Sequence, residues 1–300
     1  MTAARITTIH LIDASPYIFR AFFALPASIR DREGNAANAI YGFTSFIVKY
    51  LTDARPSHIA IAFDQNLNGS FRNQTLATYK ATRPQPPRAL EQQLVGCGEA
   101  AAALGVASFI DPDYEADDLI ATIIGQLDRR DRRFVVASVD KDLAQLVGER
   151  VTLVDPGRSA PLDAAGVRAK FGVSPEQIAD WLALAGDAVD NIPGVRGIGP
   201  KTAAELLQEH GSLESIYAAV GSIRRSDRRG ARALAERLEQ GVELAGLSKQ
   251  MATLARDAPV DVSLRRLRYC GIDEPKAQLL FARLGFKTLA ARLPGVQTTR

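Results

Sequence analysis

Acidic residues at the ends of apolar runs are the feature of this 300-residue sequence that could carry chemistry. Three runs of strand length end in aspartate, at Asp13, Asp64 and Asp140. Open α/β sheets place their ligand sites outside the carboxyl ends of the strands, so we expect these three side chains to converge. Because like charges that converge need a cation, the pattern predicts a metal site at one edge of a sheet.

Further acids extend this set, since Glu115 and Asp118 are spaced to share one helix face and Asp187 and Asp190 form a second such pair. All nine candidate metal ligands are carboxylates: Asp13, Asp64, Glu115, Asp117, Asp118, Asp140, Asp142, Asp187 and Asp190. Oxygen ligands alone favour Mg²⁺ or Mn²⁺ over zinc. Two such ions suit phosphodiester hydrolysis, in which one activates water and the other stabilises the leaving oxygen.

Each acid taken singly also has a structural interpretation. Acids in the first turn of a helix oppose the helix dipole, Asp140-Lys141-Asp142 fits a turn, and an aspartate that ends a strand is commonly a cap or turn former. The three histidines are scattered along the chain and are interpreted as structural: His10, His58 and His210. The acids taken together favour the metal site.

The elements that must position these acids alternate between strands and helices. Strands are predicted over 9–12, 58–63, 134–139 and 151–154, and helices over 36–51, 87–104 and 117–127. This alternation is typical of an α/β domain with a central, mainly parallel sheet flanked by helices, here over residues 1–174. Ser174, Pro175 and Glu176 form a helix start. Residues 175–300 are predicted to form a second, mainly α domain.

Composition and charge limit the functional class. With 46% hydrophobic and 24% charged residues, the chain is typical of a soluble globular protein. It has no apolar run long enough to span a bilayer and no export signal, and Cys97 and Cys270 are far apart, so we expect a cytoplasmic, nucleoid-associated protein with reduced thiols. Arginines gather over 224–237; beside an acidic site they suit a bound polyanion, although a solvated helix face is the simpler interpretation of any one run.

The most specific string runs from Asn191 to Ala203 and resembles a helix-hairpin-helix, predicted over residues 181–209. Its glycines permit a tight hairpin, and the helix start at Pro200 offers free amides to a phosphate. The candidate DNA contacts here are Gly194, Gly197, Gly199, Lys201 and Thr202. Such contacts hold the DNA backbone without reading bases. A glycine-rich helix-helix turn is the structural alternative, and the spacing does not fit a P-loop.

A long polar connection over residues 65–88 follows the strand that ends at Asp64. Long connections in compact domains are usually functional or disordered. Arg72, Lys80 and Arg83 could contact phosphates, and Tyr79 offers a ring on which an unpaired base could stack.

Taken together, these residues resemble the 5′ nuclease, or flap endonuclease, superfamily, and most closely the 5′–3′ exonuclease domain of bacterial DNA polymerase I. The resemblance extends to about Phe286. It is carried by Leu11-Ile12-Asp13, Tyr17 to Arg20, Phe63-Asp64, Ser70-Phe71-Arg72, Tyr79-Lys80-Ala81-Thr82-Arg83-Pro84, Glu115-Ala116-Asp117-Asp118, Asp140-Lys141-Asp142-Leu143, Gly186-Asp187 and Asp190-Asn191-Ile192-Pro193-Gly194.

The resemblance implies a PIN-like 5′ nuclease fold and roles for the site residues. Asp13, Asp64, Glu115 and Asp117 would serve mainly one ion, and Asp142, Asp187 and Asp190 mainly the other, with Asp140 and Asp118 between or behind them. Lys80 and Arg83 would join these acids in catalysis. Arg20, Arg72, Tyr79, Lys80 and Arg83 would hold the scissile strand beneath a helical arch near 65–88. The hairpin Gly194–Thr202 would hold the duplex, with K⁺ as a candidate ligand of its carbonyls.

The implied activity is that of a structure-specific 5′ nuclease in replication and repair, a monomer acting on DNA with 5′ flaps, nicks or 5′ ends and on RNA primers. No polymerase domain follows residue 300, so we expect a free-standing enzyme. Ala14 stands where the family usually has glycine, and Ser138-Val139 replaces a smaller pair; both predict altered positioning and rate. Two alternatives stay open: a non-catalytic DNA-junction binder and a small ribonuclease with a related α/β domain.

Overall fold

The computed structural model describes residues 6–66, 69–157, 160–290 and 293. Its central sheet has five strands, all paired in parallel, in the order β3-β2-β1-β4-β5. The strands are β1 Thr7–Asp13, β2 His58–Asp64, β3 Ala107–Asp111, β4 Arg132–Ala137 and β5 Val151–Val154. Strand order reverses between β1 and β4, which is the position where α/β sheets bind ligands.

Four of the five strands were predicted, and the prediction missed β3. This strand lies at the sheet edge, and its Ile110 is 57% exposed, so it lacks the continuous apolar run of a strand buried on both faces. The predicted strand 134–139 was too long at its carboxyl end, since β4 ends at Ala137 and Val139 is exposed. Asp140 therefore lies on the loop after β4.

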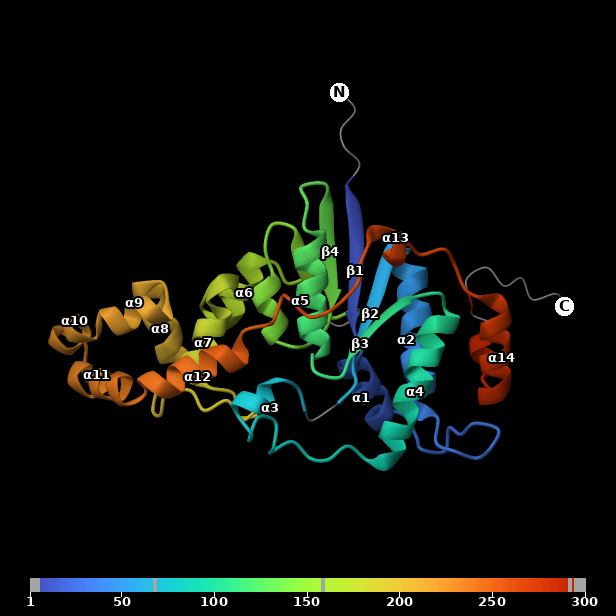
Figure 1. Ribbon diagram of the computed structural model, residues 1–300, viewed down its shortest axis with the longest axis horizontal. Helices are drawn as coiled ribbons and strands as arrows, with labels where there is room; N and C mark the ends of the chain where they lie inside the picture. The colour runs from blue at the N-terminus through green and yellow to red at the C-terminus, as the bar shows by residue number, and fades with distance from the viewer. Residues whose placement is uncertain (1–5, 67–68, 158–159, 291–292, 294–300) are drawn as a thin grey trace, which may run out of the picture.

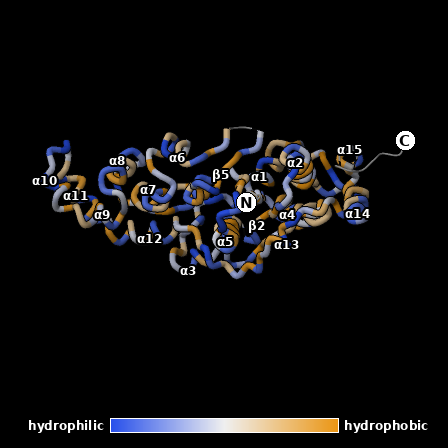
Figure 2. Tube along the Cα trace, turned by 90° about the horizontal axis from the view of Figure 1, so that it is seen from above, coloured by the Kyte–Doolittle hydropathy of each residue, from blue (hydrophilic) through white to orange (hydrophobic). Residues whose placement is uncertain are grey.

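Helices cover both faces of the sheet. Alternate strand residues divide between two cores: Ile9 and Leu11 pack in one with helix α5, and Ile12 and Ile61 pack in the other with helices α1, α2 and α4. These helices are α1 Ser15–Ala24, α2 Asn38–Ala54, α4 Arg88–Ala103 and α5 Ala116–Leu127. Figure 2 shows α5 largely in the hydrophobic colours, as a helix buried on most sides requires. The predicted helices 36–51, 87–104 and 117–127 are confirmed.

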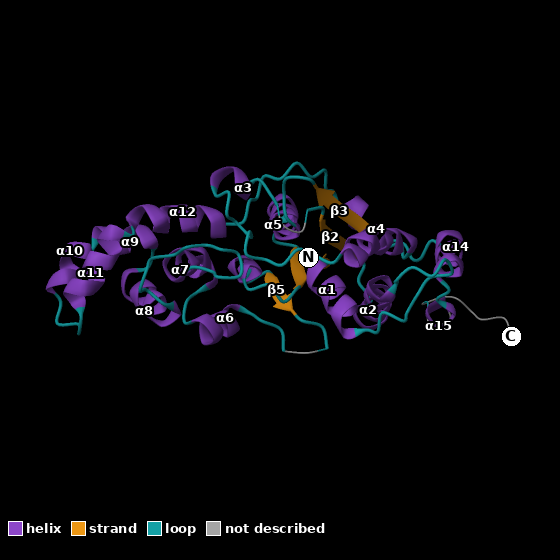
Figure 3. Cartoon of the chain, turned by 90° about the horizontal axis from the view of Figure 1, so that it is seen from below, coloured by secondary structure: helices purple, strands orange, loops and turns teal. Residues whose placement is uncertain are grey.

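The chain beyond residue 173 contains helices and no strand in the part that the structure describes, which agrees with the predicted mainly α region. Figure 3 shows helices α6 to α12 to one side of the strands. The remaining helices are α3 Arg72–Thr75, α6 Ala164–Phe171, α7 Ile178–Ala185, α8 Pro200–His210, α9 Leu213–Ala218, α10 Val220–Arg225, α11 Ala231–Gln240, α12 Val242–Ala252, α13 Leu264–Leu267, α14 Glu274–Leu284 and α15 Lys287–Ala290, with 3₁₀ helices η1 Asp142–Leu146 and η2 Pro175–Gln177.

The predicted second domain, 175–300, does not hold together as one unit, because its carboxyl-terminal part returns to the α/β region. Figure 1 shows α14 beside α4, on the far side of the sheet from α8 to α12. The backbone of Tyr269 donates to the Ser57 carbonyl, and α14 buries Leu280 and Phe281 in the core that contains α4. The amphipathic pattern of α14 predicts a helix but cannot specify the surface that it covers.

The returning segment passes close to the turn after α4. Gly105 has φ +73°, and a Cβ there would lie 2.0 Å from the Gly271 carbonyl oxygen. Gly34 also has a positive φ, +89°, but a Cβ there would meet no atom within 4 Å. Alanine at Gly34 would therefore cause backbone strain alone, whereas alanine at Gly105 would cause both backbone strain and a steric clash.

We expect Gly105→Ala to lower the free energy of unfolding by about 2–5 kcal/mol, since overpacking adds about 1–3 kcal/mol to a left-handed backbone cost of about 1–2 kcal/mol. Gly34→Ala should lower it by the backbone cost alone. Urea unfolding measures both, and limited proteolysis should detect release of residues 264–289 in the first variant only. Equal losses in the two variants would show that the returning segment does not pack against Gly105.

Candidate active site

A small acidic hollow lies at the carboxyl edge of the sheet, at the reversal point between β1 and β4. It has a volume of about 230 Å³ and is also lined by Ser15, Phe19 and two basic residues. Its carboxylates are Asp13, Asp64, Glu115, Asp117 and Asp140. They come from the ends of β1 and β2, from the start of α5 and from the loop after β4. We call this set the first acidic cluster.

Serine hydroxyls and a helix amide fix the orientation of these acids. Ser138 donates to Asp13 Oδ2 at 2.7 Å, and its oxygen accepts the Asp140 N–H at 3.0 Å. Ser15 donates to Asp64 Oδ2 at 2.5 Å, and the Ala116 N–H donates to Asp64 Oδ1 at 2.7 Å. Sequence reasoning did not select either serine as a functional residue. Their spacing, two residues from Asp13 and two from Asp140, is the signal that could have found them.

The carboxylates of the first acidic cluster destabilise one another when they are all charged. Burial, followed by the charge of Asp64, raises the pKa of Asp13 well above its usual value. Burial, followed by the charges of Asp118 and Glu115, does the same to the pKa of Asp117. A cation in the hollow would reverse both effects, because opposite charge favours the ionised form.

A second acidic cluster consists of Asp142, Asp187 and Asp190, which are all buried and offer carboxylate oxygens within 4.8 Å of one another. Asp142 opens η1, and the other two lie in the loop after α7, where Asp187 and Ile192 exchange backbone hydrogen bonds. Asp140 connects the two clusters, since the Asp142 N–H donates to Asp140 Oδ1 at 2.9 Å. Burial, followed by the charge of Asp140, raises the pKa of Asp142 to about 8.

Both clusters fit a divalent metal ion. Glu115 Oε1 and Asp142 Oδ1 are buried and have no hydrogen-bond partner among the described residues. A buried carboxylate oxygen without a partner is costly, and a metal ion would provide one. Among the described residues no histidine joins a candidate metal group, and His10 Nδ1 bonds the Tyr50 hydroxyl at 2.8 Å. All-oxygen donors favour Mg²⁺ or Mn²⁺.

Two predicted basic residues lie directly against the acids. The Lys80 ammonium is 2.5 Å from Glu115 Oε2, and the Arg83 guanidinium pairs with Asp190. Burial raises the pKa of Glu115, but Lys80 and then Arg72 more than offset this, so its pKa lies below the usual value. Lys80 has φ +57°, and its N–H donates to the Asp190 carbonyl at 3.0 Å. The segment that carries these cations is therefore held against the second acidic cluster.

The predicted helical arch near 65–88 is wrong for the described part of that range. Its one helix is α3, with four residues, and residues 67–68 lie outside the described residues. Pro84, Pro86 and Pro87 cannot continue a helix. The segment instead folds down onto the site.

Arg72 is not available to DNA as predicted, because its side chain is only 1% exposed. Its guanidinium forms a two-bond pair with Asp118, at 2.7 and 2.8 Å, and donates to the Met251 and Thr253 carbonyls. Asp118 also accepts from the backbone N–H groups of Glu115 and Ala255, so both of its oxygens are occupied. This pair positions the start of α5 and the end of α12, and Asp118 does not line the acidic hollow.

Tyr79 and Gly194 are also predicted DNA contacts that the structure buries. Tyr79 is 3% exposed, its ring lies near the cations of Arg72 and Lys80, and its hydroxyl donates to Glu115 at 3.3 Å, so no base can stack on it in this conformation. Gly194 is buried, and its N–H donates to the Ser248 hydroxyl at 3.0 Å. A Cβ on Gly194 would lie 2.4 Å from the Gly186 nitrogen, so glycine serves close backbone packing here.

The other predicted DNA contacts lie at the surface. Helix α7, the loop 186–199 and helix α8 occupy the range 181–209 of the predicted helix-hairpin-helix. Gly197, Gly199 and Lys201 are exposed, and Thr202 is half-buried. The Gly197 carbonyl accepts a bond from Arg237 of α11 at 3.3 Å, which adds a basic residue to this face. Arg20 is partly exposed and forms an ion pair with Asp155.

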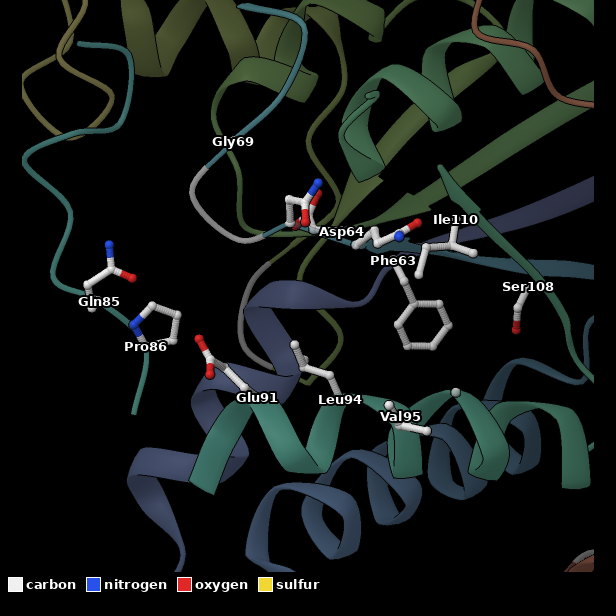
Figure 4. Close-up of a pocket in the computed structure, with 13 residues that line it drawn as sticks. Phe63, Asp64, Gly69, Gln85, Pro86, Glu91, Leu94, Val95, Ser108 and Ile110 are labelled. Carbon is white, nitrogen blue, oxygen red and sulfur yellow. The ribbon is translucent and has the colours of Figure 1, made fainter. Parts of the chain in front are cut away.

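A larger hollow of about 790 Å³ lies between α4 and the β3 edge of the sheet (Figure 4). Phe63, Leu94, Val95 and Ile110 give it an apolar lining, and Asp64 stands at its margin. It holds one carboxylate of the first acidic cluster, so the smaller hollow is the candidate metal site.

Two family models match adjacent parts of the chain. The 5′–3′ exonuclease N-terminal resolvase-like domain matches residues 8–172, and the 5′–3′ exonuclease C-terminal SAM fold matches residues 173–275. The chain belongs to the 5′–3′ exonuclease family. The predicted family is thereby confirmed.

Bacterial DNA polymerases are among the relatives of this family member. It is 39% identical over 288 residues to DNA polymerase I of Bacillus caldotenax, and the alignment covers 94% of this chain and 32% of that protein. It is 40% identical over 273 residues to DNA polymerase I of Pseudomonas aeruginosa, which covers 91% and 29%. The chain thus spans about a third of the length of the curated relatives that it matches.

Solved structures share the fold of this family member. Bacteriophage T5 5′-exonuclease with bound zinc matches with a TM-score of 0.65 at 19% identity, covering 92% of this chain and 99% of that one. The catalytic core of Rad2 in complex with DNA substrate matches with a TM-score of 0.61 at 17% identity, covering 94% and 89%. The predicted fold class, a parallel sheet flanked by helices and followed by a helical region, is confirmed.

Ala14 stands at the position where the resemblance led us to expect glycine. Ala14 is fully buried with φ −72° and ψ −40°, a helical conformation that alanine adopts without strain.

Among the described residues, no helix is both long and apolar enough to cross a membrane.

The raised pKa of Asp142 predicts how the stability of the metal-free protein varies with pH. An aspartate of the unfolded chain has a pKa of about 3.9. A folded-state pKa of about 8 means that the stabilisation from this group is complete below the lower value and is lost as pH rises toward the higher one. Asp13 and Asp117 act in the same sense.

We therefore expect the melting temperature in EDTA to fall between pH 5 and pH 8, and Asp142→Asn to reduce that fall. Mg²⁺ should restore more stability at pH 8 than at pH 5, because protons compete with the metal for carboxylates. Asp53→Asn, which changes an exposed acid on α2, is the control. Parallel pH curves for wild type and Asp142→Asn would contradict the assignment.

Proposed function

We propose that this chain is a metal-dependent, structure-specific 5′ nuclease that hydrolyses phosphodiesters at 5′ flaps, nicks and 5′ ends of DNA and in RNA primers, in replication and repair. The observation that carries this proposal is the meeting of two acidic clusters at the reversal point of the sheet, the second of them fully buried, with Asp140 between them. Family membership supports it.

In this proposal the first acidic cluster holds one Mg²⁺ or Mn²⁺ ion, mainly through Asp13, Asp64, Glu115 and Asp117, and the second acidic cluster holds another. Bound in this way, two ions activate water and stabilise the leaving oxygen of the phosphodiester. Ser15 and Ser138 orient carboxylates of the first cluster. Lys80 and Arg83 are held beside the acids and would turn to phosphate oxygens of the scissile strand when metal neutralises the clusters.

The hairpin would hold the duplex part of the substrate. Gly197, Gly199, Lys201 and Thr202 present amides, a hydroxyl and an ammonium at the start of α8, which suits phosphate contacts. The proposal also includes Arg20 as a contact to the scissile strand and K⁺ on the hairpin carbonyls. It further includes a monomeric state and action at the nucleoid in the cytoplasm. The DNA complex of the Rad2 core, which has the same fold, supports DNA as the partner.

A labelled 5′-flap duplex tests the activity. Wild type should cleave near the junction with Mg²⁺ and not with EDTA, and Asp140→Asn should lower the rate by at least about 100-fold, or about 2.7 kcal/mol of activation free energy. Asp53→Asn should cleave as wild type does. Binding without cleavage in Mg²⁺ would favour the junction binder, and preference for an RNA hairpin would favour the ribonuclease.

Lys201→Ala tests the hairpin separately. Loss of one phosphate contact should weaken binding of all duplex sequences alike and lower the slope of log affinity against log salt by about 1. Lys49→Ala changes an exposed lysine on α2, a helix that Figure 1 shows on the other side of the sheet from α8, and should leave the slope unchanged. A loss that depends on DNA sequence would contradict a backbone contact.

A further inference from the structure

Lys141 is a charged side chain at the second acidic cluster to which neither the sequence analysis nor the proposed mechanism gives a role. Its ammonium is 2.5 Å from Asp187 Oδ2 and 3.6 Å from Asp142 Oδ1. Those two acids and Asp190 offer oxygens within 4.8 Å of one another. The ammonium therefore contacts two of the three carboxylates that would share a metal ion.

The position of this ammonium differs from that of an ordinary surface ion pair. Both of its carboxylate partners are buried, whereas the lysine side chain is 34% exposed. It also connects two separate parts of the chain, because Asp142 opens η1 and Asp187 lies in the loop after α7. In the metal-free protein one positive charge thus holds this loop against η1 and compensates part of the repulsion among three acids.

A second position is open to the same side chain. Lys141 also lines a hollow of about 260 Å³ at the loop after β4, together with Asp140, Asp155, Leu162 and Phe171. A lysine has a flexible four-carbon stem, so its ammonium can leave the acids without movement of the backbone.

We propose that Lys141 is a tethered cation that occupies the second acidic cluster until a divalent ion displaces it, and that it thereby sets the affinity of this cluster for metal. The inference rests on the proposed function, since it takes the cluster to be a metal site. A divalent ion must replace the contacts of the ammonium before it can bind all three carboxylates. The tethered charge weakens binding of this ion and leaves the first acidic cluster, where Lys80 contacts Glu115, less affected.

Titration of the metal-free, DNA-free protein with Mn²⁺, followed by electron paramagnetic resonance, tests the inference. We expect two classes of site in the wild type, with the weaker class about 10-fold tighter in Lys141→Met and nearly unchanged in Lys141→Arg, which keeps the charge. Lys170→Met is the matched control, because it removes the same charge from the lining of the same hollow but from a lysine that lies over Phe171. It should leave both classes unchanged.

Thermal melting separates displacement from a purely structural role. Lys141→Met should melt lower than wild type in EDTA, where the acids lose their counter-charge, and the difference should vanish in saturating Mn²⁺. Lys141→Gln repeats both measurements with a side chain that can still donate a hydrogen bond, in case the methionine variant does not fold. Unchanged or weaker Mn²⁺ binding, or an equal loss of stability with and without Mn²⁺, would overturn the inference.

These outcomes differ from failure of the proposed function. Wild-type protein that binds fewer than two Mn²⁺ ions, or that cleaves flaps in EDTA, would overturn the metal-dependent nuclease and the inference with it. Two bound ions and Mg²⁺-dependent cleavage, with the same weak site in wild type and Lys141→Met, would overturn the role of Lys141 alone.

Discussion

Repulsion among carboxylates confined to one edge of the sheet is the constraint on which the rest of the site depends. Parallel strands bring Asp13 and Asp64 to this edge, and the start of α5 and the loops after β4 and α7 add the other acids. Such a set is stable only with compensating positive charge. In the metal-free protein that charge comes from Lys80, Arg83 and Lys141. Lys80 and Arg83 each pair with one acid of the two clusters, and Lys141 contacts two acids of the second cluster.

The compensating contacts also explain how distant segments are held together. Arg72 is buried because it serves Asp118 and two carbonyls at the end of α12 at once. Removing one partner of such a pair would leave a buried charge, which costs about 3–5 kcal/mol. Arg72 thus links the polar connection, helix α5 and the helical region.

The strands and their acids were predictable because a parallel sheet buried on both faces leaves continuous apolar runs, and because parallel strands end at one edge. The partners of Arg72 were not predictable from local sequence. Asp118 is 46 residues away and Thr253 is 181 residues away, so a basic residue in a polar connection looked like a surface contact. The same limit applies to Lys141, whose partner Asp187 is 46 residues distant. Resemblance to a family supplied the two-cluster division that spacing alone left open.

The return of residues 264–289 to the α/β region makes the helical region an insertion with both ends anchored. At one end η2 packs against η1. At the other end the Ala252 carbonyl accepts from Gln145, and Arg72 bonds the Met251 and Thr253 carbonyls. A segment tied at both ends has less freedom to swing than one joined by a single linker. The hairpin at the start of α8 and the acids at the sheet edge are thereby kept at a set separation. In the proposed function, a duplex bound at the hairpin would therefore place its strand at the acids a fixed number of nucleotides away.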